Sequence, residues 1–151
     1  MLGKRNSRFH YTVTALCTPA EAVALLTDVP RLTSRHPLVI GTRECPAGAG
    51  VLRSTRVTDR LRLGPVPFTI TYVADVLAAG PEEVVTVARQ RPSTTLTSRA
   101  RIRAQQDGRT RIEVTISFTA PALLFRYAFG KARHAHRELA DGMRGLLESG
   151  R

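Results

Sequence analysis

The sequence contains no tryptophan, only two cysteines and no long apolar run. Cys17 and Cys45 belong to no CxxC pair or Cys/His cluster, which favours two buried, reduced thiols over a metal or redox centre. No apolar stretch approaches the roughly 20 residues that cross a bilayer. Residues 1–8 carry basic side chains without the apolar segment of a secretory signal. We therefore expect a cytoplasmic protein without a transmembrane segment.

Acidic side chains are also scarce. Asp and Glu number 12 against 23 Lys and Arg, which gives a net charge of +11. A basic surface attracts polyanions through counterion release. Arginine supplies nearly all of this charge, since Lys4 and Lys131 are the only lysines. Together with abundant Ala, Gly and Pro, that bias is also typical of GC-rich coding, so the charge alone identifies no anionic partner.

Linkers, internal repeats and familiar catalytic motifs are absent as well. The 151 residues are enough for one domain with its own core. Hydrophobic residues make up 42% and charged residues 23%, which is ordinary for a globular protein. The lack of a nucleophile elbow, a Gly-rich phosphate loop and a conventional triad disfavours hydrolases and kinases. We expect one domain over residues 1–151.

Alternation of apolar and polar residues with a period of two dominates the first 120 residues, and this pattern is typical of half-buried strands. It predicts strands over 9–17, 38–45, 51–63, 67–78, 83–91, 94–105 and 109–120. Asp107-Gly108 is a strong hairpin turn between the last two. The predicted inward phase contains Val51, Thr55, Val57, Leu61, Leu63, Phe68, Ile70, Tyr72, Ala74, Val76, Leu96, Ser98, Ala100, Ile102, Ile112, Val114, Ile116 and Phe118.

Helical signals lie on either side of these strands. Thr18-Pro19-Ala20-Glu21 has the form of a capping box and predicts a short helix. A second short turn of helix is expected over 31–36, ending before Pro37. Residues 121–150 then form one long amphipathic helix, which can cover a curved antiparallel sheet and leave a cavity beneath it. Its predicted inner positions are Leu124, Ala128, Ala132, Ala135, Leu139, Met143 and Leu146.

This order of elements resembles the helix-grip fold of the START-like (SRPBCC) superfamily, which includes the birch pollen allergen (Bet v 1) type, lipid-transfer domains and bacterial aromatase/cyclases. Local sequence is similar to its polyketide cyclase/dehydrase branch. The matching segments are residues 18–21, Leu25-Leu26-Thr27-Asp28, Pro37, Gly50-Val51-Leu52-Arg53, Tyr72-Val73-Ala74-Asp75 and Gly108-Arg109-Thr110-Arg111. The resemblance implies an α+β fold, with a seven-stranded curved antiparallel sheet wrapped around the long C-terminal helix and two short helices between strands 1 and 2.

Polar residues that share the inward phase are the candidates for ligand contact. Arg53 would bind or polarise a ligand carbonyl or carboxylate through its rigid donor fork. The alternative is that Arg53 and Asp59 lie in water near the strand ends. Tyr72 is either core or a donor to an oxygenated aromatic molecule. The predicted ligand-binding residues are Arg53, Val57, Asp59, Phe68, Ile70, Tyr72, Ser98 and Tyr127.

Histidines offer little evidence for a metal site. His36 lies near the second short helix, where a surface position is the simpler interpretation. His134 and Glu138 are four residues apart on the long helix, but two ligands are too few for zinc, so helix-surface pairing is expected. We predict neither a metal nor a cofactor.

Three classes of function remain open. The favoured one is a module that binds a small hydrophobic or aromatic molecule in the cavity. The second is a polyketide cyclase/dehydrase-type enzyme in which Arg53, Tyr72 or Asp59 assists proton transfer. Ionisable cavity residues with shifted pKa values would favour the enzyme, and a purely apolar wall would favour binding or transport.

The third class is an adaptor that docks an anionic partner, such as an acidic carrier protein, anionic lipid or RNA. It depends on arginines in the outward phase of three strands, which would form a basic face on a meander sheet. Nucleic acid is the least favoured partner, because nucleic-acid readers interleave aromatics with such charges. The arginines are Arg56, Arg60, Arg62, Arg89, Arg91, Arg99, Arg101 and Arg103.

Overall fold

The computed structural model describes residues 3–91 and 93–149, except for the side chain of Leu63. In chain order the elements are β1 (Lys4–Ala15), α1 (Pro19–Thr27), α2 (Val29–Thr33), β2 (Val39–Cys45), β3 (Arg53–Leu63), β4 (Val66–Ala79), β5 (Glu83–Gln90), β6 (Thr94–Ala104), β7 (Thr110–Pro121) and α3 (Ala122–Glu148). The seven strands form one antiparallel sheet in the order β1-β7-β6-β5-β4-β3-β2. This α+β architecture confirms the helix-grip fold.

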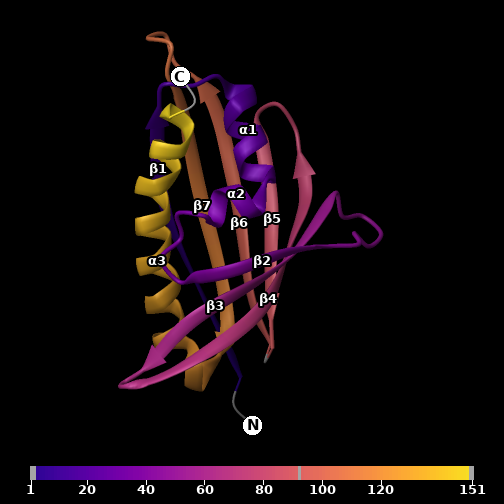
Figure 1. Cartoon of the computed structure of the whole chain (residues 1–151), viewed down its shortest axis with the longest axis vertical. Helices are drawn as coiled ribbons and strands as arrows, with labels where there is room; N and C mark the ends of the chain where they lie inside the picture. Colours follow the sequence, from indigo (N-terminus) through magenta and orange to yellow (C-terminus); the bar gives the residue numbers. More distant parts are fainter. Residues whose placement is uncertain (1–2, 92, 150–151) are drawn as a thin grey trace.

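The sheet bends around the long helix. Figure 1 shows α3 standing along β1 and β7, while β2, β3 and β4 cross obliquely in front of the other strands. The two short helices lie near the end of the molecule that holds the C-terminal part of α3. Sheet, α3 and short helices therefore enclose a common interior.

Local sequence explains how the two short helices begin. At α1 the hydroxyl of Thr18 accepts a hydrogen bond from the Glu21 N–H at 3.1 Å, and the Glu21 carboxylate accepts one from the Thr18 N–H at 3.1 Å. The predicted capping box is thus confirmed. Helix α2 begins two residues before the predicted position, because the Asp28 carboxylate caps it by accepting from the Arg31 N–H at 3.3 Å.

Strand boundaries mostly agree with the predicted ones, with one clear exception. Strand β1 begins at Lys4, five residues before the predicted start, since residues 4–8 pair with residues 117–121 at the end of β7. This pairing is not visible in the local pattern because these β1 residues are mostly polar and exposed. The hairpin between β6 and β7 turns at Gly108, whose φ of 82° is a left-handed conformation that favours glycine.

Alternate strand residues fill the interior as predicted, and α3 covers them. Helix α3 matches the predicted span, except that Gly150 lies outside the described residues. The buried positions of α3 are Phe125, Ala135, Leu139, Met143 and Leu147. Leu146 is half-buried and packs against the core as predicted, next to the fully buried Leu147, whereas Leu124 is 46% exposed. No helix in the described part of the chain is long and apolar enough to cross a membrane.

Candidate ligand-binding cavity

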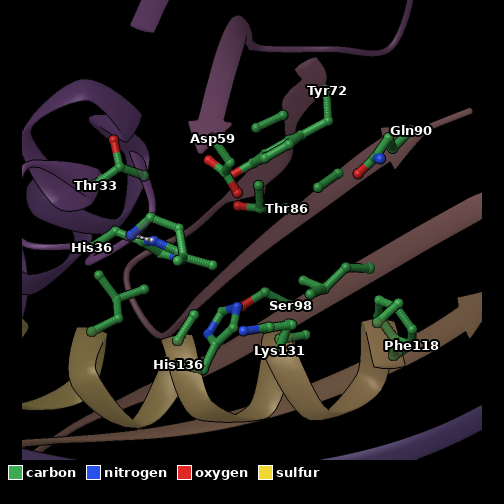
Figure 2. Close-up of a pocket in the computed structure, with 18 of the residues that line it drawn as sticks. Thr33, His36, Asp59, Tyr72, Thr86, Gln90, Ser98, Phe118, Lys131 and His136 are labelled. Carbon is green, nitrogen blue, oxygen red and sulfur yellow. Dashed lines mark hydrogen bonds between the residues drawn. The ribbon is translucent and has the colours of Figure 1, made fainter. Parts of the chain in front are cut away.

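A cavity of about 590 Å³ lies between the sheet, α3 and the short helices. This volume is in the range of about 300–1,000 Å³ typical of small-molecule sites. Its wall is mainly apolar and draws on β1, β3 to β7, α1, α2, the segment that follows α2, and α3. The polar and ionisable side chains on the wall, most of them labelled in Figure 2, are Tyr11, Thr33, His36, Asp59, Tyr72, Thr86, Gln90, Thr94, Ser98, Tyr127, Lys131 and His136.

Six of the eight predicted ligand-binding residues lie on this wall, namely Asp59, Phe68, Ile70, Tyr72, Ser98 and Tyr127. Val57 is fully buried in the core beside it and is not among the lining residues. The structure therefore brings most of the predicted set together, although their contact with a ligand stays a prediction.

Arg53 does not line the cavity. Its guanidinium forms an ion pair with Glu44 at 2.5 Å and donates a hydrogen bond to the Thr27 carbonyl at 3.0 Å. Arg53 is the first residue of β3, and its side chain is 41% exposed. The alternative placement at a wet strand end thus describes Arg53 but not Asp59.

Asp59 is the most unusual polar residue on the wall. Its carboxyl projects from β3 into the region between β4 and α2, and the residue is only 6% exposed. Its Oδ1 atom is buried without a hydrogen-bond partner among the described residues. Burial raises the pKa of this carboxyl to about 6. Burial, and secondarily the charge of Asp59, raise the pKa of Tyr72, which therefore stays a neutral phenol.

A cluster of two histidines and a tyrosine forms another part of the wall. The Tyr11 hydroxyl lies 3.2 Å from Nδ1 of His136 on α3. The rings of His36 and His136 are nearly perpendicular, with centroids 6.4 Å apart. Burial lowers the pKa of His36 to about 4. Burial and the nearby His36 lower the pKa of His136 to about 4 as well, so both imidazoles are neutral near pH 7.

His36 corrects the prediction of a surface histidine, since it is half-buried on the cavity wall. Its Nδ1 accepts a hydrogen bond from the backbone N–H of Leu38 at 3.2 Å. A neutral imidazole whose Nδ1 is an acceptor carries its proton on Nε2. The position after α2 thus supplies a neutral hydrogen-bond donor to the interior.

The cavity reaches the surface near the N-terminal end of α3. Leu123 is 77% exposed and yet lines the cavity, as does Leu124. Tyr127 donates a hydrogen bond from its hydroxyl to the Arg62 carbonyl at 2.8 Å, which ties α3 to the end of β3. The ammonium of Lys131 lies 5.8 Å from the centre of the Tyr127 ring. Phe125 belongs instead to the core, stacked on Phe129 with centroids 5.2 Å apart.

Sequence reasoning missed His136 and Tyr11 as wall residues. His136 follows Ala132 by four positions and precedes Leu139 by three, so the helical period places it on the inner face. Tyr11 shares the phase of Val13 in β1, which is buried. Both signals were available in the sequence, but a polar residue inside an apolar stripe does not by itself indicate a cavity.

Other predicted features lie outside the cavity. His134 and Glu138 are both exposed on α3. Over residues 3–91 and 93–149, no group of three or more His, Cys, Asp or Glu side chains is placed to hold a metal ion.

All eight arginines of the predicted basic face are exposed, and the sheet has the meander order that places them on its outer surface. Acidic neighbours neutralise some of them. Arg89 pairs with Asp75 at 3.1 Å, and Arg99 pairs with Glu83 at 3.4 Å. Exposed pairs of this kind contribute little stability. Docking of an anionic partner on this face stays a prediction.

No protein-family model matches the sequence, and no match was found among curated proteins. Solved structures do resemble the fold. A START superfamily protein from Mycobacterium smegmatis matches with a TM-score of 0.74 and 14% identity, over 95% of this chain and 99% of that chain. The Zhui aromatase/cyclase from Streptomyces sp. R1128 matches with a TM-score of 0.64 and 15% identity, over 95% and 92%.

The di-domain ARO/CYC BexL from the BE-7585A biosynthetic pathway matches with a TM-score of 0.72 and 12% identity, over 95% of this chain and 50% of that chain. This chain thus spans about half the length of BexL. Identities this low establish likeness of fold and not of activity. The chain has the START-like helix-grip fold.

Proposed function

We propose that this protein binds a small hydrophobic or aromatic molecule in the cavity between the sheet and α3. The observation that supports the proposal is a cavity of about 590 Å³ with a mainly apolar wall, on which polar side chains such as Asp59 and the Tyr11, His36 and His136 cluster are placed at particular points. Apolar side chains supply the affinity of such sites, and a small number of placed polar groups orient the ligand. The neutral state of His36 and His136 keeps that part of the wall uncharged.

Binding of the neutral dye N-phenyl-1-naphthylamine, followed by fluorescence, tests this proposal. Ala88 lines the cavity from the middle of β5, so Ala88→Phe fills part of the space. We expect that change to weaken dye binding by about tenfold or more. Val85→Phe is the matched control, because Val85 lies on the same strand in the opposite phase and does not line the cavity.

Equal dye affinity of Ala88→Phe and the wild type would refute binding in this cavity. Native mass spectrometry of the purified protein, with extraction of any molecule that copurifies, then identifies the natural ligand. The proposal predicts that the dye displaces this copurifying molecule from the wild type and that the molecule is absent from purified Ala88→Phe.

A cyclase/dehydrase-type enzyme is the second candidate, favoured by the shifted pKa values on the wall. General acid–base catalysis is most efficient when the pKa of the catalytic group lies near the working pH. The pKa of Asp59 at about 6 meets this condition for a base. A carbonyl-rich polyketide-like thioester is the test substrate, with consumption followed by mass spectrometry. Asp59→Asn is expected to slow turnover by about a hundredfold, and an unchanged rate would exclude Asp59 as the base.

A further inference from the structure

In the part of the chain that the structure describes, Oδ1 of Asp59 lacks the hydrogen-bond partner that a buried carboxyl oxygen normally has. Buried charges in proteins are usually paired or hydrogen-bonded, because an unpaired one is costly. Within residues 3–91 and 93–149, Oδ1 of Asp59 has no hydrogen-bond partner, and no lysine or arginine forms an ion pair with this side chain. Asp59 therefore presents an unsatisfied acceptor on a mainly apolar cavity wall, at a point where a bound molecule could supply the donor.

The surroundings of Asp59 define what that ligand is like. On β3 the carboxyl lies in register with Ile70 of β4, and Leu61 and Phe68 line the wall nearby. Figure 2 shows the ring of Tyr72 and the hydroxyl of Thr86 beside it. The group that approaches Asp59 therefore belongs to a largely apolar body and carries a hydrogen-bond donor at one position.

The charge of the site favours a neutral donor over a cation. Lys131 lines the same cavity, and the whole chain carries a net charge of +11, so both disfavour entry of a positively charged ligand. Besides Asp59 itself, Lys131 and the tyrosines, the titratable groups that line the cavity are His36, after α2, and His136, on α3. Both histidines are neutral near pH 7, so they add no negative charge that would attract a cationic ligand.

We propose that the ligand is an apolar ring system bearing a neutral hydroxyl group, phenolic or enolic, and that this hydroxyl donates a hydrogen bond to the carboxylate of Asp59. The inference rests on the proposed function and adds the chemical class of the ligand. It also assigns Asp59 as the residue that distinguishes hydroxylated ligands from their purely apolar relatives. A site built to accept a hydroxyl discriminates strongly against an analogue without it, because the acceptor is then left unpaired.

Two probes with the same ring system test this assignment, namely 2-naphthol and 2-methoxynaphthalene, titrated by fluorescence near pH 7.5. The methoxy compound cannot donate a hydrogen bond. We expect the wild type to bind 2-naphthol about tenfold more tightly than 2-methoxynaphthalene, as for a hydrogen bond to a charged acceptor. In Asp59→Val the preference should disappear, and 2-methoxynaphthalene should bind at least as tightly as it does to the wild type.

These opposite effects on the two probes separate the loss of an acceptor from a general loss of structure. Valine suits a strand and removes a buried charge, and retained affinity for 2-methoxynaphthalene shows that the cavity of the variant is intact. Asp141→Asn is the matched control, since Asp141 is exposed on α3 and its removal alters the net charge equally. It should leave the tenfold preference unchanged.

Each other outcome has a defined meaning. If neither probe binds the wild type, the proposed function fails and this inference fails with it. If both probes bind, but with the same affinity ratio in wild type and Asp59→Val, the cavity binds apolar molecules and only the role of Asp59 is refuted. Tighter binding of the cation 2-(aminomethyl)naphthalene than of 2-naphthol would overturn the assignment of a neutral donor.

Discussion

Replacing Asp59 by Asn should stabilise the protein, and the gain should depend on pH. Asn has nearly the shape of a protonated aspartic acid and cannot ionise, so it removes the cost of a buried carboxylate. Burial raises the pKa of Asp59 from 3.8 to about 6. At 1.36 kcal/mol for each pKa unit, this difference amounts to about 3 kcal/mol against the folded wild type at neutral pH. Because the carboxyl borders a cavity large enough for water, we expect about 1–2 kcal/mol in practice.

The sign of the effect follows from the direction of the pKa change. A raised pKa means that the folded state holds the proton more firmly than the unfolded state, so stability is lost as pH rises from about 4 through about 6. The free energy of unfolding of Asp59→Asn minus that of the wild type should therefore widen by about 1–2 kcal/mol between about pH 4.5 and about pH 8. Above about pH 7 the difference should be constant.

Urea unfolding followed by circular dichroism, at several pH values between these limits, measures this difference. Effects of other titrating groups cancel because both proteins contain them. Asp141→Asn should show no such trend, since Asp141 is exposed. The free energies of unfolding of wild type and Asp59→Asn could instead differ by the same amount over the whole pH range. Asp59 would then not lose its proton in a buried site, and the argument for an unpartnered carboxylate would fail.

Three further perturbations test other parts of the structure. Because burial lowers the pKa of His36 to about 4, the free energy of unfolding should fall as pH drops from about 6.5 through about 4. His36→Asn keeps an acceptor for the Leu38 N–H and should reduce this acid-induced loss, measured by urea unfolding, by on the order of 2 kcal/mol. An identical loss in both proteins would contradict the neutral state of His36. Thr18→Ala should lower the free energy of unfolding by about 1 kcal/mol through loss of the α1 cap. Thr18→Ser keeps the capping hydroxyl and should retain most of this stability. Gly142→Ala should destabilise the protein by about 1–3 kcal/mol, because the new methyl group would overlap Cβ of Arg35. Gly145→Ala on the same helix meets open space and should stabilise the protein by up to about 1 kcal/mol. Equal effects of the two changes in thermal unfolding would refute the close packing of Gly142 against Arg35.

The fold could be predicted from sequence because one face of the sheet is apolar and the other polar along most of its strands. Residues such as Ile112, Val114 and Ile116 alternate with polar neighbours, and the structure buries all three. The same alternation predicts that Asp59 and Tyr72 lie on the inner face, and both line the cavity. Phase along a strand is a local property, and local properties are what a single sequence records well.

The parts of the site that could not be predicted depend on residues far apart in the chain. Arg53 shares the inward phase, yet Glu44 on the neighbouring strand and the Thr27 carbonyl hold its guanidinium outside the cavity. His136 is partnered by Tyr11, which lies 125 residues earlier. Neither pairing has a local sequence pattern. The side chains at strand ends and in polar clusters therefore had to be placed by the structure.

The energetics of Asp59 connect the stability of this fold with its proposed ligand. An unpartnered carboxylate destabilises the empty protein, whereas a hydroxyl that donates to it favours the ionised form and lowers its pKa toward the ordinary value. Binding of such a ligand below about pH 6 must then release a proton, and its affinity must rise as pH increases through the pKa of the free protein. An apolar ligand without a donor displaces water from the carboxylate and favours its protonated form, so its affinity should not rise with pH. Asp59 therefore lowers the stability of the ligand-free protein and, through the same unpaired acceptor, favours binding of hydroxylated ligands over purely apolar ones.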